Sequence, residues 1–299
     1  MCYTANHERD AVVTDVAPPS PTRPVLRWHG GKWRIAPWII GHFPKHRVYT
    51  EVFGGAASVL MRKSRSYAEI YNDLDGEIVN LFRVLQDPRT AGALRDLLRL
   101  TPFAREEFNL AYIPSAEPVE RARRLVIVGF MGFGSNGHNT TVRTGFRAKS
   151  NRSGTTPAHD WAHWPEKMGA LVERLQGVVI EQKDAFEVLE QHDSPETLHY
   201  VDPPYVHSTR DLGGERGSHQ RDYRHELDDV GHRRLAALLH RLTGMVVLSG
   251  YPAPLYDVEL YADWHRVEKE SLADGARKRV EVLWMNRAAH LKLVLGDLA

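Results

Sequence analysis

The sequence predicts a large α/β fold that carries an inserted segment. Short apolar runs alternate with stretches of helical period along most of the chain, which is typical of a sheet covered by helices. The last two apolar runs flank residues 271–276, a short polar turn with a glycine, which favours an antiparallel hairpin. Residues 91–165 interrupt the alternation. At 299 residues the chain is long enough for one domain with an insertion.

Each apolar run predicts one strand, because it is rich in β-branched and aromatic residues and is bounded by turn residues. In order, the predicted strands are residues 48–53, 67–71, 178–181, 198–201, 245–248, 265–269 and 280–285. Apolar residues at helical spacing predict helices between them. These are residues 56–61, 77–85, 164–175 and 227–242. Residues 23–90 and 166–299 are therefore expected to form the main domain.

The interrupting segment is strongly basic. Residues 91–100 and 119–130 are helical in pattern, and residues 129–154 are rich in Gly, Ser, Asn and Thr. Residues 121–152 contain seven basic side chains and no acid, a local charge of +7 in a chain whose net charge is +1. A solvated basic loop is one interpretation, and contact with a polyanion is the other. We expect residues 91–165 to be an inserted recognition subdomain.

Composition excludes several classes of protein. No apolar run approaches the roughly 18 residues that span a bilayer, and the first residues lack the order of a signal peptide, so a cytoplasmic location is expected. Residues 1–22 are Pro-rich without amphipathic period and are expected to be a disordered leader. A single cysteine, Cys2, excludes an internal disulfide. His159 and His163 mimic the helix of a zinc hydrolase, but no convincing third ligand follows, so no metal is expected.

Four of the predicted strands end in a glycine loop or an acid. Ligands of open α/β sheets bind at the carboxyl ends of the strands, where such loops converge. Asp73 follows Glu51 by 22 residues, the spacing at which an acid reaches the ribose of a nucleoside-containing cofactor. The four strand ends carry Phe53-Gly54-Gly55-Ala56-Ala57-Ser58, then Asn72-Asp73, then Asp184, and finally Asp202-Pro203-Pro204-Tyr205.

These motifs, in this order, resemble those of the Dam-like D12 class of DNA adenine N6 methyltransferases. The resemblance covers nearly the whole chain after the leader. Residues 28–32 (Trp-His-Gly-Gly-Lys) resemble the opening motif of that family, and residues 202–205 resemble its catalytic tetrapeptide. Val52 replaces a common proline, and Ala57 replaces a frequent glycine. Tyr223, Glu226 and residues 281–286 resemble most closely the branch found in phages and mobile elements.

The resemblance implies a Rossmann-like fold, a bound S-adenosylmethionine and a set of site residues. The Asp202 carboxylate and the Pro203 carbonyl would accept the two N–H bonds of adenine N6, and Tyr205, after Pro204, would stack on the base. Asp73 would hold the ribose of the cofactor, and Asp184 its adenine amino group. The rest of the cofactor pocket would consist of Trp28, Gly31, Lys32, Phe53, Gly54 and Gly55.

The implied substrate is double-stranded DNA, from which the target adenine is flipped, bound by a monomer of the enzyme. The expected DNA contacts are Arg124, Arg143, Arg147, Lys149 and Arg152. Three alternatives remain open at this point. The chain could be a dinucleotide-dependent oxidoreductase, a DNA-binding module without catalysis, or a methyltransferase of the same fold that acts on cytosine N4, RNA or a protein glutamine. Cytosine C5 methylation is disfavoured, because that chemistry needs a cysteine nucleophile.

Overall fold

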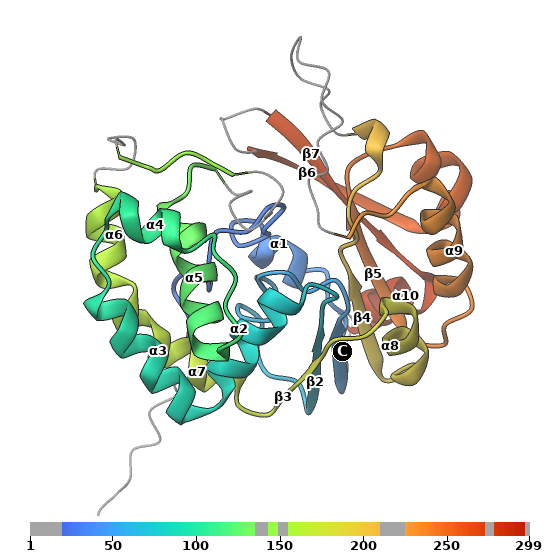
Figure 1. Cartoon of the computed structure of the whole chain (residues 1–299). Helices are drawn as coiled ribbons and strands as arrows, with labels where there is room; N and C mark the ends of the chain where they lie inside the picture. The colour runs from blue at the N-terminus through green and yellow to red at the C-terminus, as the bar shows by residue number, and fades with distance from the viewer. Residues whose placement is uncertain (1–19, 135–142, 149–154, 210–224, 273–277, 297–299) are drawn as a thin grey trace, which may run out of the picture.

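A seven-stranded mixed sheet forms the centre of the molecule (Figure 1). The computed structural model describes residues 20–134, 143–148, 155–209, 225–272 and 278–296. The strand order is β3-β2-β1-β4-β5-β7-β6, in which the first five strands are parallel and β7 is antiparallel to both of its neighbours. The strands are β1 Val48–Glu51, β2 Ala68–Asn72, β3 Val178–Glu181, β4 Thr197–Val201, β5 Met245–Gly250, β6 His265–Leu272 and β7 Lys278–Met285.

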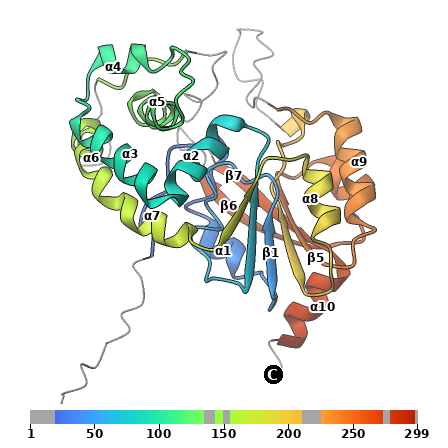
Figure 2. The same ribbon diagram turned by 60° about the horizontal axis from the view of Figure 1, so that its bottom comes forward.

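Helices cover both faces of the sheet (Figure 2). One face is covered by α1, α2 and α7, with α3 and α5 packed outside them, and the opposite face is covered by α8 and α9. The α-helices are α1 Ala36–Ile40, α2 Gly76–Gln86, α3 Pro88–Leu100, α4 Arg105–Leu110, α5 Pro118–Met131, α6 Pro157–His163, α7 Met168–Leu175, α8 Ala185–Gln191, α9 Asp229–Leu239 and α10 Arg287–Gly296. Short helical turns are η2 Pro165–Lys167, η3 His207–Thr209 and the π-helical η4 Leu255–Leu260.

The central strands are buried on both faces, which explains their nearly continuous apolar sequences. Every residue of β4 and β5 is buried. Side chains of β4 alternate between two hydrophobic clusters, since Leu198 and Tyr200 face the helices around α2, while Val201 faces α8 and α9. This alternation fixes the register of β4 and therefore the position at which its last residue leaves the sheet.

All seven predicted strands are present, and the last two form the expected antiparallel pair. The predicted helix at residues 56–61 is wrong, because this stretch forms a series of turns. Ala57 has a φ of 50° there, a left-handed conformation that cannot continue a right-handed helix. The predicted helix at 164–175 begins only at Met168, after η2, and helices α1, α4, α6, α8 and α10 were not predicted from the sequence.

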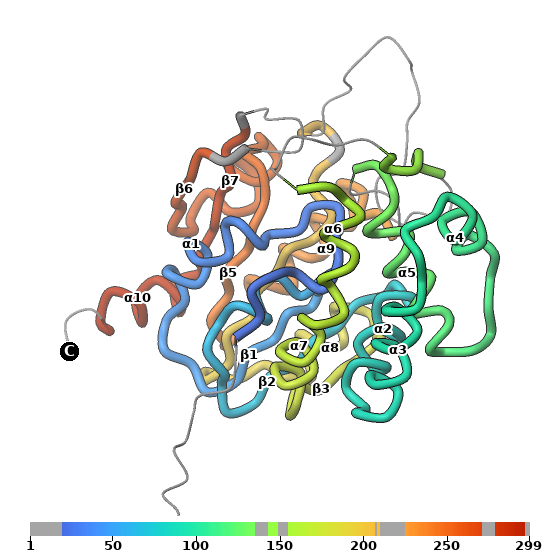
Figure 3. The backbone as a smooth tube through the Cα atoms, turned by 90° about the vertical axis from the view of Figure 1, so that its left-hand side faces the viewer, coloured from blue at the N-terminus to red at the C-terminus, as the bar shows by residue number. Residues whose placement is uncertain are grey.

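Helices of the predicted insert share a hydrophobic core with the sheet. Leu94 on α3 and Ile127 on α5 belong to the same cluster of buried side chains as Phe82 on α2 and Tyr49 on β1. Figure 3 shows a second close approach, in which α1 lies beside the β6–β7 hairpin. There the Lys269 ammonium lies 6.0 Å from the ring centroid of Trp38. Segments distant in sequence are thus held together around the sheet.

Within the described residues, no helix combines the length and apolar character needed to cross a membrane. The same residues contain no cluster of three or more His, Cys, Asp or Glu side chains placed to hold a metal ion. His159 and His163 lie on α6, a short helix whose buried contacts come from Pro157 and Trp161. The expected leader, residues 1–22, lies almost wholly outside the described residues.

Candidate active site

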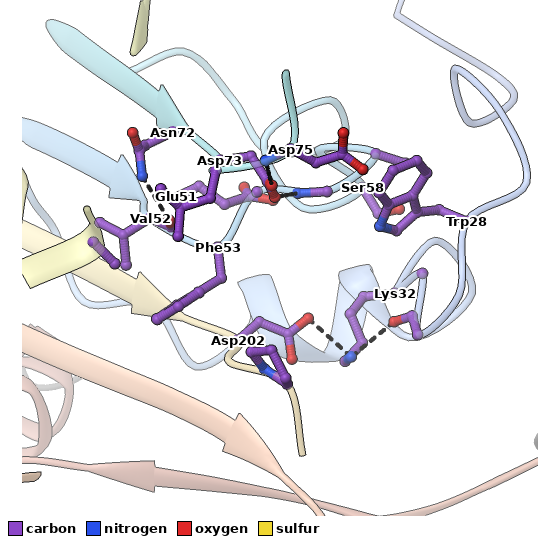
Figure 4. Close-up of a pocket in the computed structure, with 18 of the residues that line it drawn as sticks. Trp28, Lys32, Glu51, Val52, Phe53, Ser58, Asn72, Asp73, Asp75 and Asp202 are labelled. Carbon is purple, nitrogen blue, oxygen red and sulfur yellow. Dashed lines mark hydrogen bonds and ion pairs between the residues drawn. The ribbon is translucent and has the colours of Figure 1, made fainter. Parts of the chain in front are cut away.

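A pocket lies at the carboxyl ends of β1, β2 and β4 (Figure 4). The space inside it, with the open solvent at its mouth included, is about 1010 Å³. Its walls come from five segments of the chain together with Ala185 at the start of α8. The segments fall within residues 28–32, 51–59, 72–75, 200–204 and 225–227.

Asp202 follows β4 directly and forms an ion pair at the wall of this pocket. Its Oδ2 lies 2.8 Å from the Lys32 Nζ, and its Oδ1 accepts a hydrogen bond of 2.7 Å from the Ser249 hydroxyl. The Asp202 side chain is 16% exposed and the Lys32 side chain 6%. Both residues line the pocket, so the ion pair holds the carboxylate at the cavity instead of drawing it into the interior.

Tyr205 is buried next to this ion pair. Its hydroxyl donates a hydrogen bond of 3.0 Å to Glu281 on β7, and its ring packs edge-on against Tyr251 with centroids 4.5 Å apart. The Lys32 ammonium lies 4.6 Å from the centre of the Tyr205 ring. Burial raises the pKa of Glu281 above its usual value and raises the pKa of the Tyr205 hydroxyl. The structure thus brings Lys32, expected at the cofactor, together with Asp202 and Tyr205, expected at the base.

The glycines of the predicted cofactor loop are required by contacts within the protein. A Cβ atom on Gly54 would lie 2.2 Å from the Tyr71 ring, and one on Gly55 would lie 2.6 Å from the indole nitrogen of Trp28. Gly55 also has a φ of 47°. Gly31 makes a tight turn, because its N–H donates to the Trp28 carbonyl at 3.1 Å. The left-handed φ of Ala57 explains why glycine suits its position.

Asp73 is fixed by backbone donors at the end of β2. Its Oδ2 accepts from the Gly55 N–H and its Oδ1 from the Asp75 N–H, both at 2.8 Å. Burial outweighs these hydrogen bonds and raises the pKa of Asp73 to about 6. In Figure 4 the Phe53 ring lies between Asp73 and Asp202, so the side chains expected at the cofactor and at the base face one cavity.

Glu51 is a pocket residue that the sequence analysis did not assign. Its Oε2 accepts hydrogen bonds of 2.8 Å from the Tyr49 hydroxyl and from the Leu60 N–H. Burial raises the pKa of Glu51 to about 8, while both hydrogen bonds oppose the rise. The feature of the sequence that could have identified Glu51 is its position, an acid at the end of a strand predicted to be buried. His225 and Leu227 also line the pocket, together with Glu226, and follow a stretch outside the described residues.

Asp184 does not line the pocket. Its Oδ1 accepts a hydrogen bond of 2.8 Å from the Phe186 N–H and so caps α8. Its neighbour Ala185 reaches the pocket instead. An acid directly after a strand is a frequent helix cap, and this geometry explains the spacing without a ligand.

The basic residues of helix α5 are paired within the protein. Arg121 contacts Glu77 at 2.8 Å, Arg123 contacts Glu107 and Glu120, and Arg124 contacts Glu120 at 2.6 Å. The local excess of charge in the sequence is therefore partly offset by acids, of which Glu77 and Glu107 lie on other helices and Glu120 lies on α5 itself, just before residues 121–152. This pairing leaves Arg124 poorly placed for the DNA contact expected of it.

Arg143 and Arg147 lie on the segment that follows α5. Arg143 is exposed, with its guanidinium 4.8 Å from the Tyr112 ring centroid and 3.2 Å from the Asn109 side-chain oxygen. Arg147 is partly buried and donates to the Phe130 carbonyl at 3.3 Å. Burial, together with the nearby Arg27, lowers the pKa of Arg147. Lys149, Arg152 and Tyr223 lie outside the described residues.

Comparison with known proteins points to one family. A family model for D12 class N6 adenine-specific DNA methyltransferases matches residues 28–269. A curated relative, the DNA adenine methylase of Haemophilus influenzae, is 27% identical over 197 residues. That match covers 62% of this chain and 64% of the relative, so the chain spans somewhat less than two thirds of the relative's length. The family match includes every residue that lines the pocket.

Proposed function

The chain belongs to the D12 class N6 adenine-specific DNA methyltransferase family, and we propose that it transfers a methyl group from S-adenosylmethionine to N6 of a flipped adenine in duplex DNA. One observation carries the proposal. The carboxylate of Asp202 is held at the wall of a pocket that also contains Asp73 and the loop of Gly54 and Gly55. A hydrogen-bond acceptor for an amine thus adjoins the pocket that we assign to the cofactor.

The residues of the pocket suit S-adenosylmethionine. Asp73 and Glu51 offer carboxyl oxygens to hydroxyl and ammonium groups, and Phe53 and Trp28 offer apolar faces to the rest of the molecule. Bound there, the cofactor supplies an electrophilic methyl group on a sulfonium. We assign its binding to Trp28, Lys32, Phe53 and Asp73, while Gly31, Gly54 and Gly55 shape the chain around it.

Asp202 and Pro203 would orient the amine of the target base. The lone pair of an amine attached to a purine is delocalised, so it becomes a useful nucleophile only when acceptors hold both N–H bonds. The Asp202 carboxylate and the Pro203 carbonyl are the two acceptors, and the carboxylate also stabilises the positive charge that develops on N6. In the structure the Lys32 ammonium contacts the Asp202 oxygen that the amine needs, so the amine would share this oxygen with Lys32 or displace it.

Tyr205 would stabilise the flipped base. Its ring centre lies 4.6 Å from the ammonium of Lys32, the ion-pair partner of Asp202, and stacking of a base on an aromatic ring contributes about 1–3 kcal/mol. This contribution offsets part of the cost of unstacking the adenine from the duplex. Of the five expected DNA contacts, we assign the exposed Arg143 and the partly buried Arg147 to DNA, since neither forms an ion pair with another residue of the described ranges.

Substitution of Asp202 tests the proposed function. We expect Asp202→Asn to reduce transfer of radiolabelled methyl to adenine by roughly 10²-fold or more, because the amide is neutral and has one acceptor oxygen where the carboxylate has two. Asp263→Asn, an exposed change far from the pocket, is the matched control and should retain activity. Digestion of the product DNA to nucleosides identifies the labelled base. Label in cytosine, or full activity of Asp202→Asn, would refute the proposal.

A further inference from the structure

Two buried hydroxyl groups lie behind the Asp202 carboxylate, on the side away from Lys32. Ser249 is on β5 and Tyr200 is on β4, and each is 1% exposed. The Ser249 Oγ lies 2.7 Å from the Asp202 Oδ1 and 3.1 Å from the Tyr200 hydroxyl. The two strands pair in parallel, which brings these groups together from distant parts of the chain.

The number of hydroxyl hydrogens fixes which group donates in each of these two hydrogen bonds. A carboxylate can only accept, so the single hydroxyl hydrogen of Ser249 is donated to Asp202. The Ser249 oxygen then accepts, and the Tyr200 hydroxyl donates to it. Burial raises the pKa of Tyr200 well above its usual value, so this hydroxyl keeps its proton. The order of donation is therefore Tyr200 to Ser249 to Asp202.

These two hydrogen bonds end on one oxygen of the Asp202 carboxylate and leave its other oxygen for the substrate. Oδ1 has a buried neutral donor, whereas Oδ2 faces Lys32 at 2.8 Å and the pocket. The χ2 torsion of an aspartate is broad, so its carboxylate can rotate unless a contact holds it. Where the amine of the base replaces Lys32 at Oδ2, the Ser249 hydroxyl is the contact that remains to fix the plane of the carboxylate.

We propose that Ser249, supported by Tyr200, is a positioning residue that fixes the rotation of the Asp202 carboxylate and reserves Oδ2 for the N6–H bond of the target adenine. This inference rests on the proposed adenine methylation. Ser249 and Tyr200 act through Asp202, so their hydroxyl groups should control the methyl-transfer step and leave the KM for S-adenosylmethionine unchanged.

Kinetics of Ser249→Ala and Tyr200→Phe test the inference. Misplacement of a reacting group by about 1 Å can cost roughly 10²-fold, so we expect kcat of Ser249→Ala to fall by about 10- to 100-fold, with KM for S-adenosylmethionine within about twofold. The acidic limb of the kcat profile should also move to higher pH, because a donor to the carboxylate favours its charged form. Ser249→Thr restores the hydroxyl and should recover most of the loss.

Tyr200→Phe gives a smaller change that keeps the ring and its packing. We expect kcat to fall by about 3- to 10-fold. The double variant Ser249→Ala, Tyr200→Phe should lose no more than Ser249→Ala alone, because both substitutions break the same series of hydrogen bonds. Tyr256→Phe is the matched control. The buried Tyr256 hydroxyl contacts His232 at 2.9 Å and takes no part in the hydrogen bonds from Tyr200 to Ser249 to Asp202. This substitution should lower the melting temperature without a change in kcat.

The outcomes separate the inference from the proposed function. If the wild-type protein does not methylate adenine in duplex DNA, the proposed function is refuted. An active wild type with unchanged kcat and pH profile in both Ser249→Ala and Tyr200→Phe refutes the positioning role alone. If Ser249→Ala fails to fold, the comparison of Tyr200→Phe with Tyr256→Phe decides, because equal kcat values for these two variants contradict the inference.

Discussion

Glu51 illustrates how burial changes the behaviour of a single acid at the residue scale. Its carboxyl accepts two hydrogen bonds yet has a pKa of about 8 in the folded protein. The ordinary value of 4.5 applies to the unfolded chain. The folded state therefore binds this proton more tightly. The contribution of Glu51 to stability is fully present below pH 4.5 and is lost as pH rises through about 8.

Glu51→Gln should therefore make the stability of the protein less sensitive to pH. The amide keeps an oxygen for the Tyr49 hydroxyl and the Leu60 N–H but never acquires charge. We expect the free energy of unfolding of the wild type to fall more steeply between pH 5 and pH 9 than that of the variant, with the variant more stable at the alkaline end. Urea denaturation at several pH values measures both slopes, and parallel slopes would contradict the assigned pKa.

Asp73 should make cofactor affinity depend on pH. Its pKa of about 6 means that it gains charge between pH 5 and pH 7, and a charged carboxylate accepts hydrogen bonds from ribose hydroxyls more strongly than a neutral one. We expect the affinity for S-adenosylmethionine to rise across this range. Isothermal titration calorimetry should show a weaker and flatter dependence for Asp73→Asn. An unchanged profile would remove Asp73 from the cofactor site.

The sequence indicated most pocket residues but not their chemical states. Asp73 and Asp202 could be placed at one edge because parallel strands end there, and the structure brings them to one cavity. The raised pKa of Glu51 depends on a burial that arises only when separate segments pack. Asp184 satisfied the same pattern, yet its side chain caps α8, since an acid after a strand serves either purpose.

At the scale of elements, the loop after β1 depends on a close fit between Gly54 and β2. Gly54→Ala would place a methyl group 2.2 Å from the Tyr71 ring, which is fully buried and packed against Phe82. Such overpacking costs about 1–3 kcal/mol, and we expect it to displace the loop and weaken cofactor binding. Thermal unfolding and calorimetry with S-adenosylmethionine measure the two effects.

Gly92→Ala is the matched control for this substitution. Gly92 lies within α3, and a Cβ atom added there would meet nothing within 4 Å. Replacement of a helical glycine by alanine stabilises a helix by about 0.5–1 kcal/mol. We therefore expect opposite changes in melting temperature for the two variants. A stable Gly54→Ala protein with normal cofactor affinity would contradict the close fit.

Strands were easier to predict than helices for a physical reason. The buried strands β4 and β5 are short runs in which most residues are apolar, a pattern that can be recognised without knowledge of their neighbours. Short helices such as α4 and α8 depend on caps and on contacts with the rest of the molecule, which the local sequence does not show. The wrong helix at 56–61 contains two good helix formers, Ala56 and Ala57, but tertiary contacts hold Ala57 in a left-handed conformation.

At the scale of the whole molecule, basic side chains that cluster in the sequence form ion pairs with acids in the folded protein. Arg121, Arg123 and Arg124 follow one another closely, but each pairs with an acid. A charge window read from the sequence cannot include acids supplied by other elements, here Glu77 and Glu107. The basic residues available for DNA are therefore fewer than the sequence indicated.

Arg143 and Arg124 should differ in their effect on DNA binding. One phosphate contact contributes about 0.9 to the slope of log affinity against log salt. We expect Arg143→Ala to reduce the slope by about that amount, and Arg124→Ala, whose guanidinium is paired with Glu120, to leave it unchanged. Fluorescence anisotropy with a labelled duplex at several salt concentrations measures the slopes. Equal effects of the two substitutions would contradict this assignment.

The position of β7 between β5 and β6 has a consequence for synthesis on the ribosome. β6 emerges first, but its neighbour in the sheet is made later, so β6 cannot dock until β7 has left the exit tunnel. Glu281, the partner of Tyr205, arrives on that same strand. A nascent chain halted before Lys278 would therefore have the parallel strands but lack the Glu281 carboxyl that accepts the Tyr205 hydroxyl.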